Sequence, residues 1–258
     1  MFELFAYEFM QRAIIGAILI GMCCGLIGPF LVLRRLSLLG DGLAHLAFGG
    51  IAFGFLFGIS PIISSFIFAV IGGLVVKELM KKNIYGEASI ALVLSFGVGL
   101  GILVIGATRG FGVDIFSYFI GSLSTLSQFD VIVIALISVV LSVFLLTSYR
   151  YLLLQTFHQD MALNRHWHEY AFTIMSALVV VIAIRAVGIL LVTALIVLPT
   201  LIALRFASSF FQTVIFAVGL SIFANLFGII LSYYLDLPPS GVIVMSLFCI
   251  FLVSLLKR

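Results

Sequence analysis

Charged side chains are scarce in this chain. Asp, Glu, Lys and Arg make up 9% of its 258 residues, whereas 64% are hydrophobic and the mean hydropathy is +1.38. This composition excludes a soluble domain of this length and is typical of a protein that crosses the lipid bilayer many times. Backbone groups in a bilayer must be hydrogen-bonded within the protein, and the apolar runs are about 20 residues long without strict alternation. We therefore predict an all-α polytopic membrane protein.

The sequence also lacks several motifs. It has no Gly-x-x-x-x-Gly-Lys-Ser/Thr loop for ATP phosphates, no His-Glu-x-x-His motif and no Gly-x-Ser-x-Gly motif. Cysteine is limited to Cys23, Cys24 and Cys249, which lie in apolar runs without Cys-x-x-Cys spacing and are expected to be packing residues. We interpret the net charge of +3 as a signal of membrane topology and expect no nucleic-acid partner.

Nine apolar segments are predicted to be transmembrane helices, all in one domain that covers residues 1–258. They cover roughly residues 13–33, 42–58, 62–76, 88–108, 131–148, 170–184, 189–204, 210–233 and 242–256. The break between the sixth and seventh rests on Arg185 and Gly188, and a count of eight follows if these two segments form one helix. Gly21 and Gly25 form a small-xxx-small pair, which predicts the close approach of another helix.

The basic residues predict the orientation in the membrane, because Lys and Arg concentrate in cytoplasmic loops. Placing the loops at 34–35, 77–82, 149–169 and 205 and the C-terminus in the cytoplasm accounts for ten of the thirteen basic residues. These ten are Arg34, Arg35, Lys77, Lys81, Lys82, Arg150, Arg165, Arg205, Lys257 and Arg258. The N-terminus is then outside, the C-terminus is cytoplasmic, and the number of spans is odd.

Asp41 and His45 are the most informative polar pair, because they lie four residues apart at the start of a long apolar helix. Side chains at i and i+4 of a helix are neighbours on one face, roughly 6 Å apart between Cβ atoms. Ionisable residues inside a membrane span usually face a water-filled path or a bundle interior. Two interpretations remain open. Either Asp41 caps the helix N-terminus and His45 hydrogen-bonds to it, or the two side chains are transient metal ligands.

The longest polar stretch covers residues 149–169. It is either a solvated connector or a docking surface for a partner, with a short amphipathic core at residues 156–164. His166 and His168 are two residues apart and would face different sides of a helix, so they make a weak metal site. Trp167 between them is expected to anchor the segment at the membrane surface.

Four isolated polar residues near or within spans have simpler interpretations. Arg185 and Asp236 lie beside predicted helix ends and are expected to be interfacial. Glu87 lies at the start of a span, where a negative charge is favourable. Asn225 is expected to form a hydrogen bond between helices and not to bind a metal.

Several segments, taken in order, resemble one family. They are Gln11-Arg12-Ala13, the run from Leu33 to Asp41 and on to His45, residues 157–162, and the run from Gly188 to Val192 and on to Pro199. The Arg-Arg-x-Ser-x-x-Gly-Asp-x-x-x-His core is the most specific of these motifs. The family is the membrane permease of zinc and manganese ABC importers, and the resemblance covers essentially the whole chain.

This resemblance implies a type II ABC importer-like bundle that works as a homodimer in the cell (inner) membrane. It implies a cytoplasmic ATP-binding subunit and an extracellular or periplasmic metal-binding protein as partners. Asp41 and His45 would bind the passing metal ion. The coupling helix that docks into the ATPase would lie at about residues 157–164, with Phe157, His158, Asp160 and Ala162 in its motif. The family often has Asp where His158 stands, and Asp160 is the nearest carboxylate that would compensate.

The ion itself is expected to be a transported substrate, with no permanently bound cofactor. One carboxylate and one imidazole from each of two subunits make a four-ligand set that suits Zn²⁺ and also holds Mn²⁺. Manganese-type members often have Leu-Pro after the histidine, whereas Leu46 is followed here by Ala47, which favours zinc. The alternative within the family is a manganese or iron importer. An intramembrane enzyme and a stand-alone metal–proton exchanger are the alternatives from other classes.

Overall fold

The computed structural model describes residues 7–107, 126–157 and 166–256, and the regular structure in these ranges is helical. The helices are α1 (Glu8–Leu33), α2 (Leu39–Phe57), α3 (Pro61–Lys81), α4 (Gly86–Ala107), α6 (Gln128–Phe157), α7 (His166–Val187), α8 (Ile189–Phe206), α9 (Phe210–Leu235) and α10 (Pro239–Leu255). Seven of them are long and apolar enough to cross a membrane, while α8 and α10 are apolar but shorter. The predicted all-α membrane fold is confirmed.

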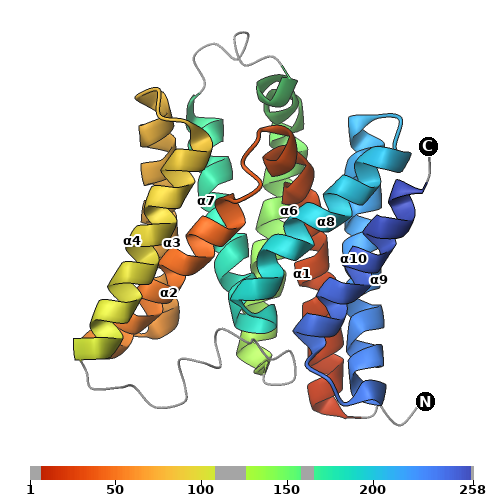
Figure 1. Cartoon of the computed structure of the whole chain (residues 1–258), viewed down its shortest axis with the longest axis horizontal. Coiled ribbons are helices and arrows are strands. Elements are labelled where there is room, and N and C mark those ends of the chain that lie inside the picture. The colour runs from red at the N-terminus through yellow and green to blue at the C-terminus, as the bar shows by residue number, and fades with distance from the viewer. Residues whose placement is uncertain (1–6, 108–125, 158–165, 257–258) are drawn as a thin grey trace.

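The helices form two groups joined by a central pair (Figure 1). On one side, α2 packs mainly against α3 and α4; on the other, α1 packs mainly against α9, with α8 and α10 beside them. Between the groups lie α6 and α7, and α7 contacts α3, α2, α8 and α1. Helical hydrogen bonds satisfy the backbone of the spans apart from the interruptions at Pro29 of α1 and Pro199 of α8, and side-chain packing joins the spans.

The contact between α1 and α9 is close enough to exclude side chains from α1. A Cβ atom at Gly25 would lie 2.6 Å from the Cα atom of Val218, and one at Gly21 would lie 2.9 Å from the side-chain nitrogen of Asn225. Only glycine fits at such distances, because carbon atoms normally stay about 3.5–4.0 Å apart. The close approach predicted from Gly21 and Gly25 is confirmed.

Each predicted span corresponds to a helix, including the two on either side of the predicted break. Gly188 separates α7 from α8 with φ 84° and ψ 163°, a backbone conformation that favours glycine. The main difference is at residues 149–157, which were predicted to belong to the polar stretch but continue α6 to Phe157. This extension is held from outside the helix, because the Arg34 guanidinium donates to the Leu152 carbonyl at 2.9 Å and to the Thr156 hydroxyl at 3.0 Å.

The predicted cytoplasmic loops gather at one end of the bundle (Figure 1). The end of α1, the turn from α3 to α4, the end of α6, the turn from α8 to α9 and the end of α10 all lie there. The start of α1 lies at the opposite end. We call the end of the bundle that holds the predicted cytoplasmic loops the basic end. The arrangement agrees with an odd number of crossings.

Candidate metal site

The chain reverses direction between α1 and α2, and this turn places Asp41 near the start of a helix. Arg35 adopts a left-handed conformation with φ 60°. Leu38 occupies the N-cap of α2 without a side-chain hydrogen bond, and Asp41 follows in the first turn. The interpretation of Asp41 as the helix cap is therefore wrong. Its carboxylate still lies in the first turn of α2, close to the positive end of the helix dipole.

Asp41 and His45 face the same small volume without bonding to each other. The His45 Nε2 atom lies 3.6 Å from the Asp41 Oδ1 atom, which is too long for a hydrogen bond. The His45 side chain is 22% exposed and the Asp41 side chain 34%. The buried Nδ1 atom of His45 has no hydrogen-bond partner among the described residues. The carboxylate and the imidazole thus converge and remain partly accessible, as two ligands of one metal ion must.

Two glycines fix the helices on either side of this pair. Gly97 of α4 lies against the backbone of α2, since a Cβ atom there would be 2.5 Å from the Leu46 Cα atom and 2.8 Å from the His45 carbonyl carbon. Gly40 of α2 faces α8, where a Cβ atom would lie 3.0 Å from the Ile196 Cδ1 atom and 3.9 Å from the Thr193 hydroxyl. The Thr193 hydroxyl oxygen is buried and unpaired within the described part of the chain. Sequence analysis did not single out Thr193.

A polar recess lies where the turn between α1 and α2 meets the start of α4. Its volume is about 220 Å³, and Arg35, Ser37, Leu38 and Glu87 contribute to its walls. Leu38 precedes Asp41 by three residues, which is about one helical turn, so the two side chains lie on the same face of the helix start. Glu87 is in the first turn of α4, as expected.

The ligand set of one chain is incomplete. No group of three or more His, Cys, Asp or Glu side chains lies close enough together to hold a metal ion within residues 7–107, 126–157 and 166–256. Zinc sites in proteins usually have four ligands. Asp41 and His45 together supply two such side chains, fewer than that number.

The residues predicted to contact an ATPase are placed only in part. Phe157 is the last residue of α6, is 54% exposed, and has its ring centroid 5.9 Å from that of Phe210. His158, Asp160 and Ala162 lie outside the described residues. His168 lies after that segment, with its Nδ1 atom 3.1 Å from the Ser148 hydroxyl and its ring against Tyr151, and neither of these neighbours is a metal ligand.

Arg34 is the basic residue that holds the end of α6 in place. Besides its two bonds to that helix, its guanidinium lies 5.0 Å from the centroid of the Phe172 ring of α7. Burial lowers the pKa of Arg34 to about 10, with the nearby Glu169 carboxylate opposing the shift. Arg34 remains charged at neutral pH and so continues to bind the α6 carbonyl.

An ion pair inside the bundle was not expected from the sequence. The Arg185 Nε atom lies 2.5 Å from Asp130 Oδ1, and Nη2 donates to Asp130 Oδ2 at 3.0 Å. Asp130 is only 4% exposed and also accepts hydrogen bonds from Ser127. Arg185, predicted to be a simple interfacial residue, therefore joins α7 to α6. Asn225 matches its prediction, because its amide donates to the Ala17 carbonyl of α1 at 3.0 Å.

Comparison with known proteins places the chain in a family. The chain is 28% identical over 257 residues to the manganese import system permease protein ScaB of Streptococcus gordonii, covering 96% of this chain and 91% of that protein. It is 27% identical over 260 residues to the high-affinity zinc uptake system membrane protein ZnuB of Buchnera aphidicola, covering 98% and 99%. Its fold matches PsaBC from Streptococcus pneumoniae in complex with Fab with a TM-score of 0.85 at 24% identity, covering 97% of this chain and 92% of that chain. Residues 6–258 match the ABC 3 transport family, and the chain belongs to that family.

Proposed function

We propose that this chain is the permease subunit of an ATP-driven importer of divalent metal ions, with Asp41 and His45 as ligands of the passing ion. The observation that carries the proposal is the geometry of this pair. Both side chains project from one face of α2, remain partly accessible and do not saturate each other. Membership of a transport family supports movement of the ion across the membrane in preference to intramembrane catalysis.

The incomplete ligand set supports a homodimer. Two copies of Asp41 and His45 across a symmetry axis would supply two carboxylates and two imidazoles, which is a full tetrahedral set. A site that exists only at the interface binds the ion when the two copies are close and releases it when they separate. This property suits a transporter, because an ion that binds too tightly in one state would not leave.

The chain requires partners for energy and for capture. It has no ATP-binding loop, so the ATPase is a separate subunit, and a metal-binding protein outside the membrane would deliver the ion. We assign the basic end to the cytoplasm, in accordance with the preference of Lys and Arg for cytoplasmic loops. The N-terminus then lies outside and the ATPase docks at residues 157–164. The recess beside Glu87 faces the cytoplasm and would receive the released ion.

Zinc is the ion that we propose. A mixed set of imidazole and carboxylate ligands suits Zn²⁺. In the general affinity order of divalent metal ions, Zn²⁺ binds more tightly than Mn²⁺. The absence of proline after Leu46 also resembles the zinc-type members of the family. The relatives are named for both manganese and zinc, and the ligand set accepts either ion, so the choice of zinc rests on the absence of proline after Leu46.

Competitive uptake of radioactive zinc and manganese in metal-starved cells tests this proposal. Cells would carry the permease with its ATPase and binding protein, as wild type, Asp41→Asn or His45→Ala. Asp236→Asn is a matched control, because it removes a carboxylate at the exposed end of α9. We expect both site variants to lose uptake while remaining in the membrane, and the control to retain it.

The alternatives give different results in the same cells. Uptake of manganese in place of zinc would keep the site and correct the ion. Normal uptake by both site variants would refute the ligand assignment. No uptake of either ion by the wild type, with all components present, would refute the proposed function.

A further inference from the structure

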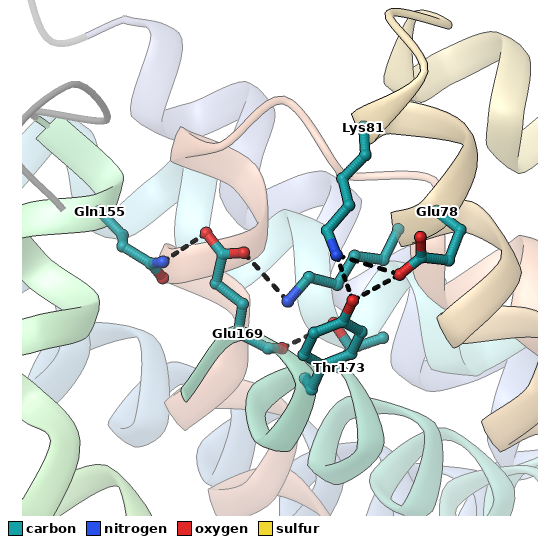
Figure 2. Close-up of polar contacts among 7 residues, drawn as sticks. Glu78, Lys81, Gln155, Glu169 and Thr173 are labelled. Atoms are coloured by element: carbon teal, nitrogen blue, oxygen red, sulfur yellow. Dashed lines mark hydrogen bonds and ion pairs between the residues drawn. The ribbon is translucent and has the colours of Figure 1, made fainter. Parts of the chain in front are cut away.

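A polar network joins α3 to α6 and α7 at the basic end, and we call it the α3–α7 clasp (Figure 2). Its first part is an ion pair between Lys77 Nζ and Glu169 Oε2 at 3.0 Å, with the Gln155 amide donating to the other Glu169 oxygen. Its second part joins the Tyr170 hydroxyl to Glu78 and to the Lys81 ammonium, which also lies 3.1 Å from Glu78. The two parts are continuous, since Lys77 Nζ lies 3.5 Å from the centroid of the Tyr170 ring.

The clasp includes residues on both sides of the segment that we expect to dock into the ATPase. Gln155 comes two residues before the end of α6, and Glu169 lies in the first turn of α7. The chain between Phe157 and His166 holds the rest of the predicted docking motif. A movement of this segment would therefore act on Gln155 and Glu169 directly, before it reached the apolar part of α7.

On its other side, the clasp leads to the candidate metal site through α3. Gly72 of α3 faces Leu46 of α2 so closely that a Cβ atom would collide with the leucine side chain. Gly73 of α3, the next residue, lies within contact distance of Leu43 of α2. Leu43 and Leu46 flank His45 in the sequence, so α3 is packed against the helix turn that carries the imidazole. The contacts run from Glu169 through Lys77 and α3 to Leu43 and Leu46 of α2, in the helix turn that carries His45.

The clasp has room to rearrange. A cavity of about 270 Å³ lies beside it and is lined by Lys77, Gln155 and Glu169 among others. The Gln155 side-chain oxygen is buried and has no partner within the described residues. The Lys77 side chain is only 11% exposed, so little water screens its attraction to Glu169. An ion pair beside a cavity can break and re-form with small movements, whereas close-packed helices move as units.

We propose that the Lys77–Glu169 ion pair transmits the movement of the docked ATPase to α2, and that Lys77 and Glu169 are positioning residues for ion release. This inference rests on the proposed function, because it needs an ATPase at residues 157–164 and an ion at Asp41 and His45. Removing the ion pair would weaken this connection, although Tyr170 would still bond to Glu78 and Lys81, and would leave the Asp41–His45 pair and the docking segment unchanged. ATP would then be hydrolysed without a matching passage of ions.

The test measures ATP hydrolysed per ion transported, using the permease–ATPase complex in proteoliposomes with its binding protein and radioactive zinc, then manganese. We expect Lys77→Met to raise this ratio by about 10-fold, within the range of measured coupling between sites. Glu169→Gln, which keeps the bond to Gln155 and removes the charge, should do the same. Exchanging the two charges, Lys77→Glu with Glu169→Lys, should restore the ratio.

A structural role alone would not produce that pattern. Lys82→Met is the matched control, because it removes the same charge from the exposed end of α3 outside the clasp, and its ratio should equal that of the wild type. Equilibrium binding of zinc to the purified complex should be unchanged in Lys77→Met. A ratio in Lys77→Met and Glu169→Gln equal to that of Lys82→Met would overturn the inference, as would loss of zinc binding in parallel with the change in ratio. Absence of transport by the wild type would instead refute the proposed function, and the inference with it.

Discussion

Gly97→Ala should damage the candidate metal site without removing Asp41 or His45. Gly97 belongs to α4 and lies against the backbone of α2 beside His45. A methyl group there would be 2.5 Å from the Leu46 Cα atom and 2.6 Å from its amide nitrogen. Both neighbours are backbone atoms, so no side chain can turn aside to make room. The two helices must separate, and His45 must move relative to α4.

The magnitude follows from the distances. Carbon atoms pack at about 3.5–4.0 Å, so the helices must separate locally by roughly 1 Å or more. Overpacking of this kind costs about 1–3 kcal/mol. Alanine stabilises a helix by about 0.5–1 kcal/mol relative to glycine, so the measured loss in the free energy of unfolding is smaller than the packing strain. If the full packing strain of about 1–3 kcal/mol is relieved at the α2–α4 contact, ion binding should weaken by a factor between about 5 and 150.

Gly99→Ala separates the contact from the helix effect. Gly99 lies two residues further along α4, and a Cβ atom there has no atom within 4 Å. The gain in helix formation is the same in both variants, so their difference in uptake and in thermal stability reports the contact alone. Radioactive zinc uptake and the unfolding temperature of the purified protein are the measurements. Equal uptake by Gly97→Ala and Gly99→Ala would refute the packing argument.

Two further predictions concern polar contacts within the bundle. Arg185→Gln leaves the Asp130 carboxylate buried without its partner and should destabilise the protein by about 3–5 kcal/mol, whereas adding Asp130→Asn should recover a large part of that loss in the same thermal unfolding assay. If the double variant is no more stable than the single one, the ion pair is not the reason for the loss. Asn225→Ala removes the bond to Ala17 and should cost about 0.6 kcal/mol, with zinc uptake retained. Complete loss of uptake with normal stability would show instead that Asn225 contacts the ion.

The sequence predicts the helices well because their signals are local. A run of apolar residues near the thickness of the bilayer is a strong signal, and each predicted span corresponds to a helix. The Gly188 break was equally visible, since arginine and glycine interrupt an otherwise apolar run. The error at residues 149–157 has the opposite cause. Nothing in that run shows that Arg34, more than a hundred residues earlier, will bind the Leu152 carbonyl and the Thr156 hydroxyl.

Part of the candidate site was predictable because its signal in the sequence is also local. Asp41 and His45 belong to one helix, so their spacing alone predicts that they share a face. Asp130 and Arg185 lie on different helices, and no periodic pattern connects them. The clasp is a similar case, because Lys77, Gln155 and Glu169 come from three helices and each looks like an ordinary charge or amide at a membrane surface. Contacts between distant segments require the fold.

The packing indicates where this molecule is stiff and where it can move. Apolar side chains gain little by leaving lipid for another apolar helix, so helices in a membrane are held by close backbone approach and by polar bonds. Backbone approach at Gly25 binds α1 to α9, and at Gly97 it binds α4 to α2. These contacts make each side of the bundle a unit. Polar groups hold the central pair at both ends: Asp130 and Arg185 join α6 to α7 at one end, and the clasp joins α6 and α7 to α3 at the other. Both ion pairs border a cavity, of about 40 Å³ at Asp130 and about 270 Å³ at the clasp, and the clasp also contains a buried Gln155 oxygen without a partner among the described residues. The clasp is therefore the end of the central pair with more room to rearrange.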